Sequence, residues 1–184
     1  MPPRADLPRR AEVLEALQKH GLSGIAAASA WDEVRPLISA TRRRGIEHAV
    51  THDADSGSLK GATLTGTRSS TDLRTHLARF QPGREYVQVH THPGSTSFSA
   101  NDLLVLATQP AIRAMAVVGL DGSWHLLSHI NPSAPRATRI PAEAFLIEIA
   151  RLEKEGVEFG ERPHRAMLVV AEPHGLRYDR LGGR

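Results

Sequence analysis

The 184-residue chain contains no cysteine, and this absence excludes disulfide bonds, thiolate metal ligands and a cysteine nucleophile. Any metal site must therefore be built from histidine, aspartate or glutamate. Aromatic residues make up only 4% of the chain, and the net charge is +3. Because nucleic-acid-binding surfaces combine basic clusters with aromatic side chains, we do not expect a nucleic-acid partner.

The one dense basic run, Arg42 to Arg44, stands just before Gly45. Glycine commonly follows the last turn of a helix, and cationic side chains there interact favourably with the helix dipole. This helix-end role is one interpretation of the arginines. A docking patch for an acidic partner is the other.

Long apolar runs are also absent. Nowhere does the chain approach the ~20 apolar residues that span a bilayer, and the N-terminal stretch has arginines without an apolar segment. We therefore expect a cytoplasmic protein that does not enter a membrane. Its length and 40% hydrophobic content suit one ordinary domain. We expect a helical extension over residues 1–28 and a single domain over residues 29–184.

Hydrophobic periodicity and turn residues predict helices and strands that alternate without a strict βαβ order. This pattern favours the α/β class, with a mixed sheet flanked by helices. Helices are expected over 9–20, 29–44, part of 70–83, 99–110 and 141–155; strands over 46–53, 58–66, 84–93 and on both sides of the turn at 121–122; and one apolar element of undecided type within 162–180.

Two histidines mark the end of the strand expected over 84–93. Residues two apart on a strand point to the same face, so His90 and His92 project together. Pro93 ends the strand, and the following helix begins with Ser99 and Asp102, which lie three residues apart on one face. Two imidazoles and a carboxylate provide three ligands for Zn²⁺ and leave a fourth position for water. This arrangement is typical of a catalytic zinc site.

The same residues have ordinary alternative roles. "SAND" fits a capping box, in which Ser99 and Asp102 bond to the first-turn backbone of a helix. A histidine on a strand is usually a packed or solvated residue. The combination of two same-face histidines, an immediate proline and a helix-borne carboxylate favours the metal site.

The run "HTHPGSTSFSAND", residues 90–102, resembles the signature of the JAMM (MPN+) metalloproteases: His-x-His-Pro, a short spacer, then Ser-x-x-Asp. The spacer has five residues, as in bacterial and phage members, where the best-known eukaryotic deubiquitinating members have six. The resemblance covers roughly residues 45–128. It implies a deaminase-like α/β sandwich, one zinc ion and hydrolysis of a peptide or isopeptide bond. Substrates of such families include peptides, ubiquitin-like tails and sulfur-carrier C-termini.

A metal-activated water still needs a carboxylate to take its proton. The family supplies a glutamate from an earlier strand, and Glu47 occupies the corresponding position. Glu85 is nearer in sequence, but a regular strand would turn it away from His90 and His92. The alternative for Glu47 is an ordinary solvated strand residue. By the family's pattern, Ser99 would donate a hydrogen bond to the developing oxyanion.

The remaining histidines have simpler expected roles. Two of them, His125 and His129, are candidates for lining a substrate groove. Surface positions are expected for His20, His76, His164 and His174. Two rival functions stay open: a non-catalytic assembly module with the same fold, and a basic nucleic-acid-associated protein.

Overall fold

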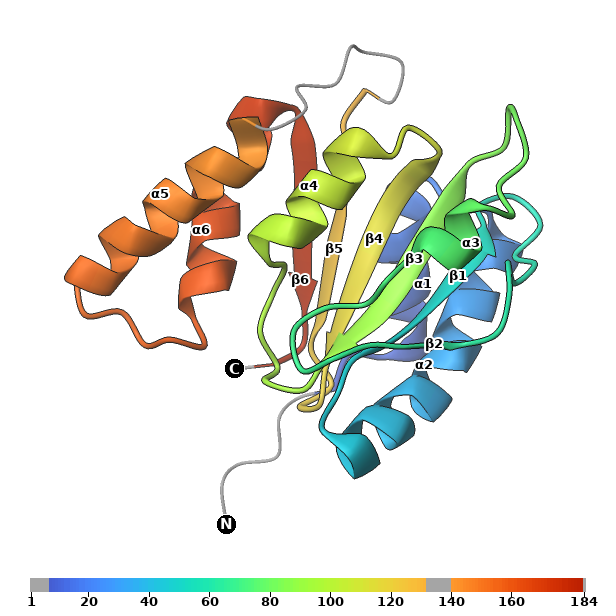
Figure 1. Ribbon diagram of the computed structural model, residues 1–184, viewed down its shortest axis with the longest axis horizontal. Helices are drawn as coiled ribbons and strands as arrows, with labels where there is room; N and C mark the ends of the chain where they lie inside the picture. Colours follow the sequence, from blue (N-terminus) through green and yellow to red (C-terminus); the bar gives the residue numbers. More distant parts are fainter. Residues whose placement is uncertain (1–6, 132–139, 184) are drawn as a thin grey trace.

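The computed structural model describes residues 7–131 and 140–183, and its centre is a six-stranded mixed sheet (Figure 1). The strand order is β2-β1-β3-β4-β5-β6; β3 and β4 are parallel, and every other neighbouring pair is antiparallel. The strands are β1 (His48–Asp53), β2 (Leu64–Thr65), β3 (Tyr86–His92), β4 (Ile112–Gly119), β5 (Trp124–His129) and β6 (Leu176–Leu181). The expected α/β class with a mixed sheet is confirmed.

Helices cover both faces of this sheet. α1 and α2 pack on one face, whereas α4 crosses the other with α5 and α6 beside it (Figure 1). The helices are α1 (Arg10–Lys19), α2 (Gly24–Arg44), α3 (Arg74–Leu77), α4 (Ala100–Thr108), α5 (Ile140–Lys154) and α6 (Arg162–Val170), followed by the 3₁₀ helix η1 (Glu172–His174). Within the described ranges, no helix combines the length and the apolar character that crossing a membrane requires.

Alternation along β3 divides its side chains between two cores. Val87 and Val89 pack with α1 and α2 in the first core, so Gln88, His90 and His92 face the side of α4. On that side Val117 and Leu127 belong to the second core. The polar residues of β3 therefore lie at the border of an apolar interior that excludes water.

Several element boundaries differ from the prediction. α2 begins at Gly24 instead of 29, because the Ser23 hydroxyl accepts the first-turn amide of Ala26 at 3.0 Å. The helix thus runs across the expected division between residues 28 and 29, and Leu17 of α1 packs in the same core as Val34 of α2. α3 is a single turn, and β2 is only two residues long.

The tail contains three elements, α6, η1 and β6, where one was expected. α6 and η1 are followed by Gly175 in the left-handed region, at φ 73°, which lets the chain reverse into the edge strand β6. The hairpin at residues 121–122 and the helix near 141–155 are confirmed as β4–β5 and α5. Residues 132–139, which precede that helix, lie outside the described residues.

The surface positions predicted for His20 and His76 are wrong, because both side chains are buried. His20 Nε2 donates to Asp179 Oδ2 at 2.9 Å, and its Nδ1 lies 2.8 Å from Ser128 Oγ. Ser128 is itself buried. This Ser–His–Asp chain therefore ties the end of α1 to β5 and β6 instead of facing a substrate.

Asp53, the last residue of β1, holds the turn that follows and forms an ion pair in which its own side chain is buried. Its carboxylate accepts the Arg84 guanidinium at 2.7 and 2.9 Å and the Ser56 amide at 2.9 Å. Burial alone would raise the pKa of Asp53, but these hydrogen bonds outweigh it and lower the pKa to about 2.

We expect Asp53→Asn to destabilise the protein by about 2 kcal/mol at neutral pH, because the substitution removes charged hydrogen bonds. A carboxyl with a lowered folded pKa stabilises above its unfolded pKa of ~3.9, and this contribution disappears as the pH falls through about 2. The free energies of unfolding of the wild type and of Asp53→Asn, measured by urea denaturation, should therefore converge as the pH falls from ~3.9 to about 2. Asp55→Asn, whose side chain is 77% exposed, is the control; equal stability of both variants at neutral pH would contradict the expectation.

Candidate metal centre

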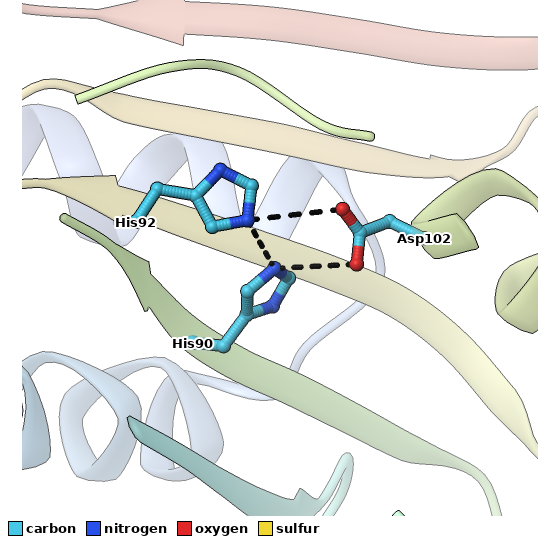
Figure 2. A group of neighbouring side chains, drawn as sticks. All are labelled: His90, His92 and Asp102. Carbon is cyan, nitrogen blue, oxygen red and sulfur yellow. Dashed lines mark hydrogen bonds and ion pairs between the residues drawn. The ribbon is translucent and has the colours of Figure 1, made fainter. Parts of the chain in front are cut away.

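The structure brings together the three residues predicted to bind a metal (Figure 2). His90 and His92 point from the end of β3 toward Asp102 in the first turn of α4. The two Nε2 atoms are 3.1 Å apart; His90 Nε2 lies 3.4 Å from Asp102 Oδ1, and His92 Nε2 lies 3.8 Å from Asp102 Oδ2. All three residues are buried. This group could hold a metal ion.

These separations suit a tetrahedral ion. Ligand atoms bound at 2.0–2.1 Å to a tetrahedral metal lie roughly 3.3 Å from one another. The Nε2–Nε2 separation of 3.1 Å and the 3.4 Å from His90 Nε2 to Asp102 Oδ1 lie close to that value, and one ligand atom from each of the three residues lies within 4.8 Å of the other two. Two nitrogens and one oxygen, without sulfur, form the donor set expected of a site that keeps an open position.

The cap of α4 orients the carboxylate of Asp102. Oδ2 accepts both the backbone N–H and the hydroxyl of Ser99 at 2.7 Å, while the Ser99 hydroxyl accepts the Asp102 amide at 3.3 Å. The capping box and the ligand group therefore coexist. One carboxylate oxygen serves the cap, and Oδ1 remains directed at His90.

The tautomer of His92 follows from its hydrogen bond. Nδ1 lies 3.1 Å from the carbonyl oxygen of Thr96, which can only accept, so Nδ1 carries the proton and Nε2 offers its lone pair. Burial, with a smaller effect of His90, lowers the pKa of His92 to about 4. The ring is therefore neutral at physiological pH, as a metal ligand must be.

His90 and Asp102 influence each other. Burial alone would lower the pKa of His90, but the Asp102 carboxylate raises it. Burial would likewise raise the pKa of Asp102, yet His90 holds it well below its usual range. The Nδ1 atom of His90 is buried without a hydrogen-bond partner. Because its pKa is lowered, Asp102 is anionic at neutral pH and available to a cation.

Glu47 lies beside the three residues, immediately before β1. Its Oε1 is 3.5 Å from His92 Nε2, and its Oε2 accepts the Thr71 hydroxyl at 3.3 Å. Burial raises the pKa of Glu47 to about 7. Glu85 instead pairs with Arg113, outside this group. Glu47 thus faces the two histidines, and Glu85 does not, as the strand geometry predicted.

The Ser99 hydroxyl donates to Asp102, so its proton points at the ligand carboxylate. A contact with a developing oxyanion would require this hydroxyl to exchange partners. The oxyanion role of Ser99 stays a prediction.

Three supporting residues were not predicted. Thr71 and Thr96 hold Glu47 and His92 from loops, where neither periodicity nor a motif marks them. Tyr178 of β6 lies beyond the resemblance, and its hydroxyl is 2.8 Å from His125 Nδ1. His125 is consequently buried in a network on the metal side of the sheet.

Comparison of the chain with protein-family models, with curated proteins and with solved structures finds no match in any of the three.

Proposed function

We propose that this protein is a zinc-dependent hydrolase of the JAMM type that cleaves a peptide or isopeptide bond. The observation that carries the proposal is the convergence of His90, His92 and Asp102, with Glu47 within 3.5 Å of His92. The spacing of residues 90–102 resembles the JAMM signature, and the mixed sheet with helices on both faces is compatible with the deaminase-like sandwich of that family.

His90, His92 and Asp102 would hold the zinc ion through Nε2, Nε2 and Oδ1. When bound, zinc would act as a Lewis acid that makes a water nucleophilic near neutral pH. The Glu47 carboxylate would accept the proton of that water and return it to the leaving amine. Burial, which raises the pKa of Glu47 to about 7 in the metal-free protein, makes this carboxylate a stronger base than an exposed glutamate.

The rest of the chain keeps these groups in position. The Thr96 carbonyl fixes the tautomer of His92, the cap at Ser99 orients Asp102, and Thr71 holds one oxygen of Glu47. Such outer partners set ligand orientation and basicity. Ser99 would also serve the oxyanion if its hydroxyl turned from Asp102 toward the substrate.

The presence of Glu47 favours a hydrolase over a non-catalytic module of the same fold. A buried carboxylate with a raised pKa costs stability, and such groups cluster at functional sites. The substrate would be a protein or peptide, and a ubiquitin-like or sulfur-carrier tail belongs to the classes that the resemblance suggests.

Metal analysis combined with a hydrolysis screen tests the proposal. The purified protein should contain about one zinc ion per chain. It should cleave at least one member of a panel of peptides and isopeptides. A chelator should abolish this activity, and added zinc should restore it. Full activity after removal of all divalent metal would refute the assignment.

A further inference from the structure

A second candidate site lies on the face of the sheet opposite to the metal centre. A hollow of about 400 Å³ opens where α1 and α2 meet the turn between β4 and β5. Both helices lie behind the sheet in Figure 1, whereas α4, the helix that carries Asp102, lies in front of it. The volume falls within the ~300–1,000 Å³ typical of small-molecule sites.

Two tryptophans give the hollow an aromatic wall. Trp124 of β5 is 2% exposed, and Trp31 of α2 is half-buried. Their rings are stacked, with centroids 5.8 Å apart and planes inclined by only 9°. A planar ring entering the hollow meets aromatic surface against which stacking is favourable.

Gly122 shapes the opposite wall. Its φ of 85° is a conformation that side chains rarely adopt, and a Cβ there would stand 2.0 Å from Leu7 Cδ2. Glycine thus lets Leu7 lie directly against the turn. The hollow is consequently bounded by apolar groups on the side of the turn as well as on the side of α2.

Two arginines, Arg10 of α1 and Arg35 of α2, also line the hollow. Within the described part of the chain, neither guanidinium forms a hydrogen bond or an ion pair, whereas Arg9 nearby pairs with Glu12. A guanidinium binds carboxylate, sulfonate or phosphate groups through paired N–H donors. The hollow therefore combines aromatic surface with positive charge that no group among the described residues neutralises.

We propose that this hollow binds a small aromatic anion. The ring of the ligand packs against Trp31 and Trp124, and its acidic group lies between Arg10 and Arg35. The site is independent of the metal centre, because the two occupy opposite faces of the sheet.

The chain's only two tryptophans both line the hollow, so intrinsic fluorescence reports directly on its occupancy. The probe is 8-anilinonaphthalene-1-sulfonate, and N-phenyl-1-naphthylamine is its uncharged counterpart. We expect saturable quenching of tryptophan by the sulfonate at one site, and weaker binding of the uncharged compound.

Replacing both arginines, with Arg10→Gln and Arg35→Gln together, should weaken sulfonate binding by at least about tenfold through loss of charge-assisted hydrogen bonds. Binding of the uncharged probe should change less than about twofold. Arg43→Gln replaces an exposed arginine of α2 outside the hollow; it is the matched control and should leave both affinities unchanged.

The side chains of Arg10 and Arg35 are exposed, so the double variant should keep its fold, and circular dichroism checks this. Unsaturable quenching, or equal sulfonate affinity in the double variant and the wild type, would overturn the proposal.

Discussion

Glu47→Gln is expected to lower kcat/KM by about 10³-fold while zinc binding is preserved. Glutamine keeps the size of the side chain and can still meet the Thr71 hydroxyl, but it cannot take a proton from water. None of the three proposed ligand atoms belongs to Glu47. Substrate turnover and metal content, measured on the same preparation, therefore separate the loss of the base from the loss of the ion.

Glu85→Gln is the matched control for this variant. Glu85 is also a glutamate close to a central strand, but it pairs with Arg113 away from the metal group. Its replacement should leave turnover within a factor of about two. If Glu47→Gln retained wild-type turnover, Glu47 would not be the base, even if zinc remained essential.

His92→Ala is expected to abolish zinc binding and hydrolysis together. The substitution removes one of the three proposed ligands, and the two that remain are too few to hold the ion. For the wild type, zinc at 1,000 times its dissociation constant should stabilise the folded state by about 4 kcal/mol, and the variant should gain almost nothing. Thermal unfolding with and without zinc measures this difference and does not depend on knowing the substrate.

His174→Ala is the control for removing any histidine, because His174 lies in η1 next to the edge strand β6, and β4 and β5 separate β6 from β3. It should keep the full zinc-dependent shift. Glu47→Gln should keep the shift as well, since its defect is in proton transfer. An unchanged shift in His92→Ala would show that the ion binds elsewhere.

The candidate metal-binding group was accessible from the sequence because local geometry determines it. The two-residue period of a strand puts His90 and His92 on one face, and Pro93 ends the strand beside them. The "SAND" motif starts α4 and places Asp102 in its first turn. Metal binding and helix capping looked like competing interpretations of Asp102. They are compatible because Oδ2 accepts the hydrogen bonds of the cap while Oδ1 stays directed at His90.

Residues with distant partners could not be found in the same way. His20 was expected at the surface, and it is buried because β5 and β6 supply Ser128 and Asp179, more than 100 residues later. Thr71 is one of several hydroxyl residues in a polar loop, and only the fold shows that it meets Glu47.

The sequence by itself determined the class of the fold, the expected strand and helix around residues 90–102, and the chemical nature of the donor set. These properties depend on contacts between residues close together in the chain, for which periodicity and capping rules hold. Only the tertiary structure decided that Glu47 lies against His92, that its burial raises its pKa to about 7, and that two tryptophans 93 residues apart form one aromatic wall. Those properties arise when strands pair and helices exclude water, and no local pattern records them.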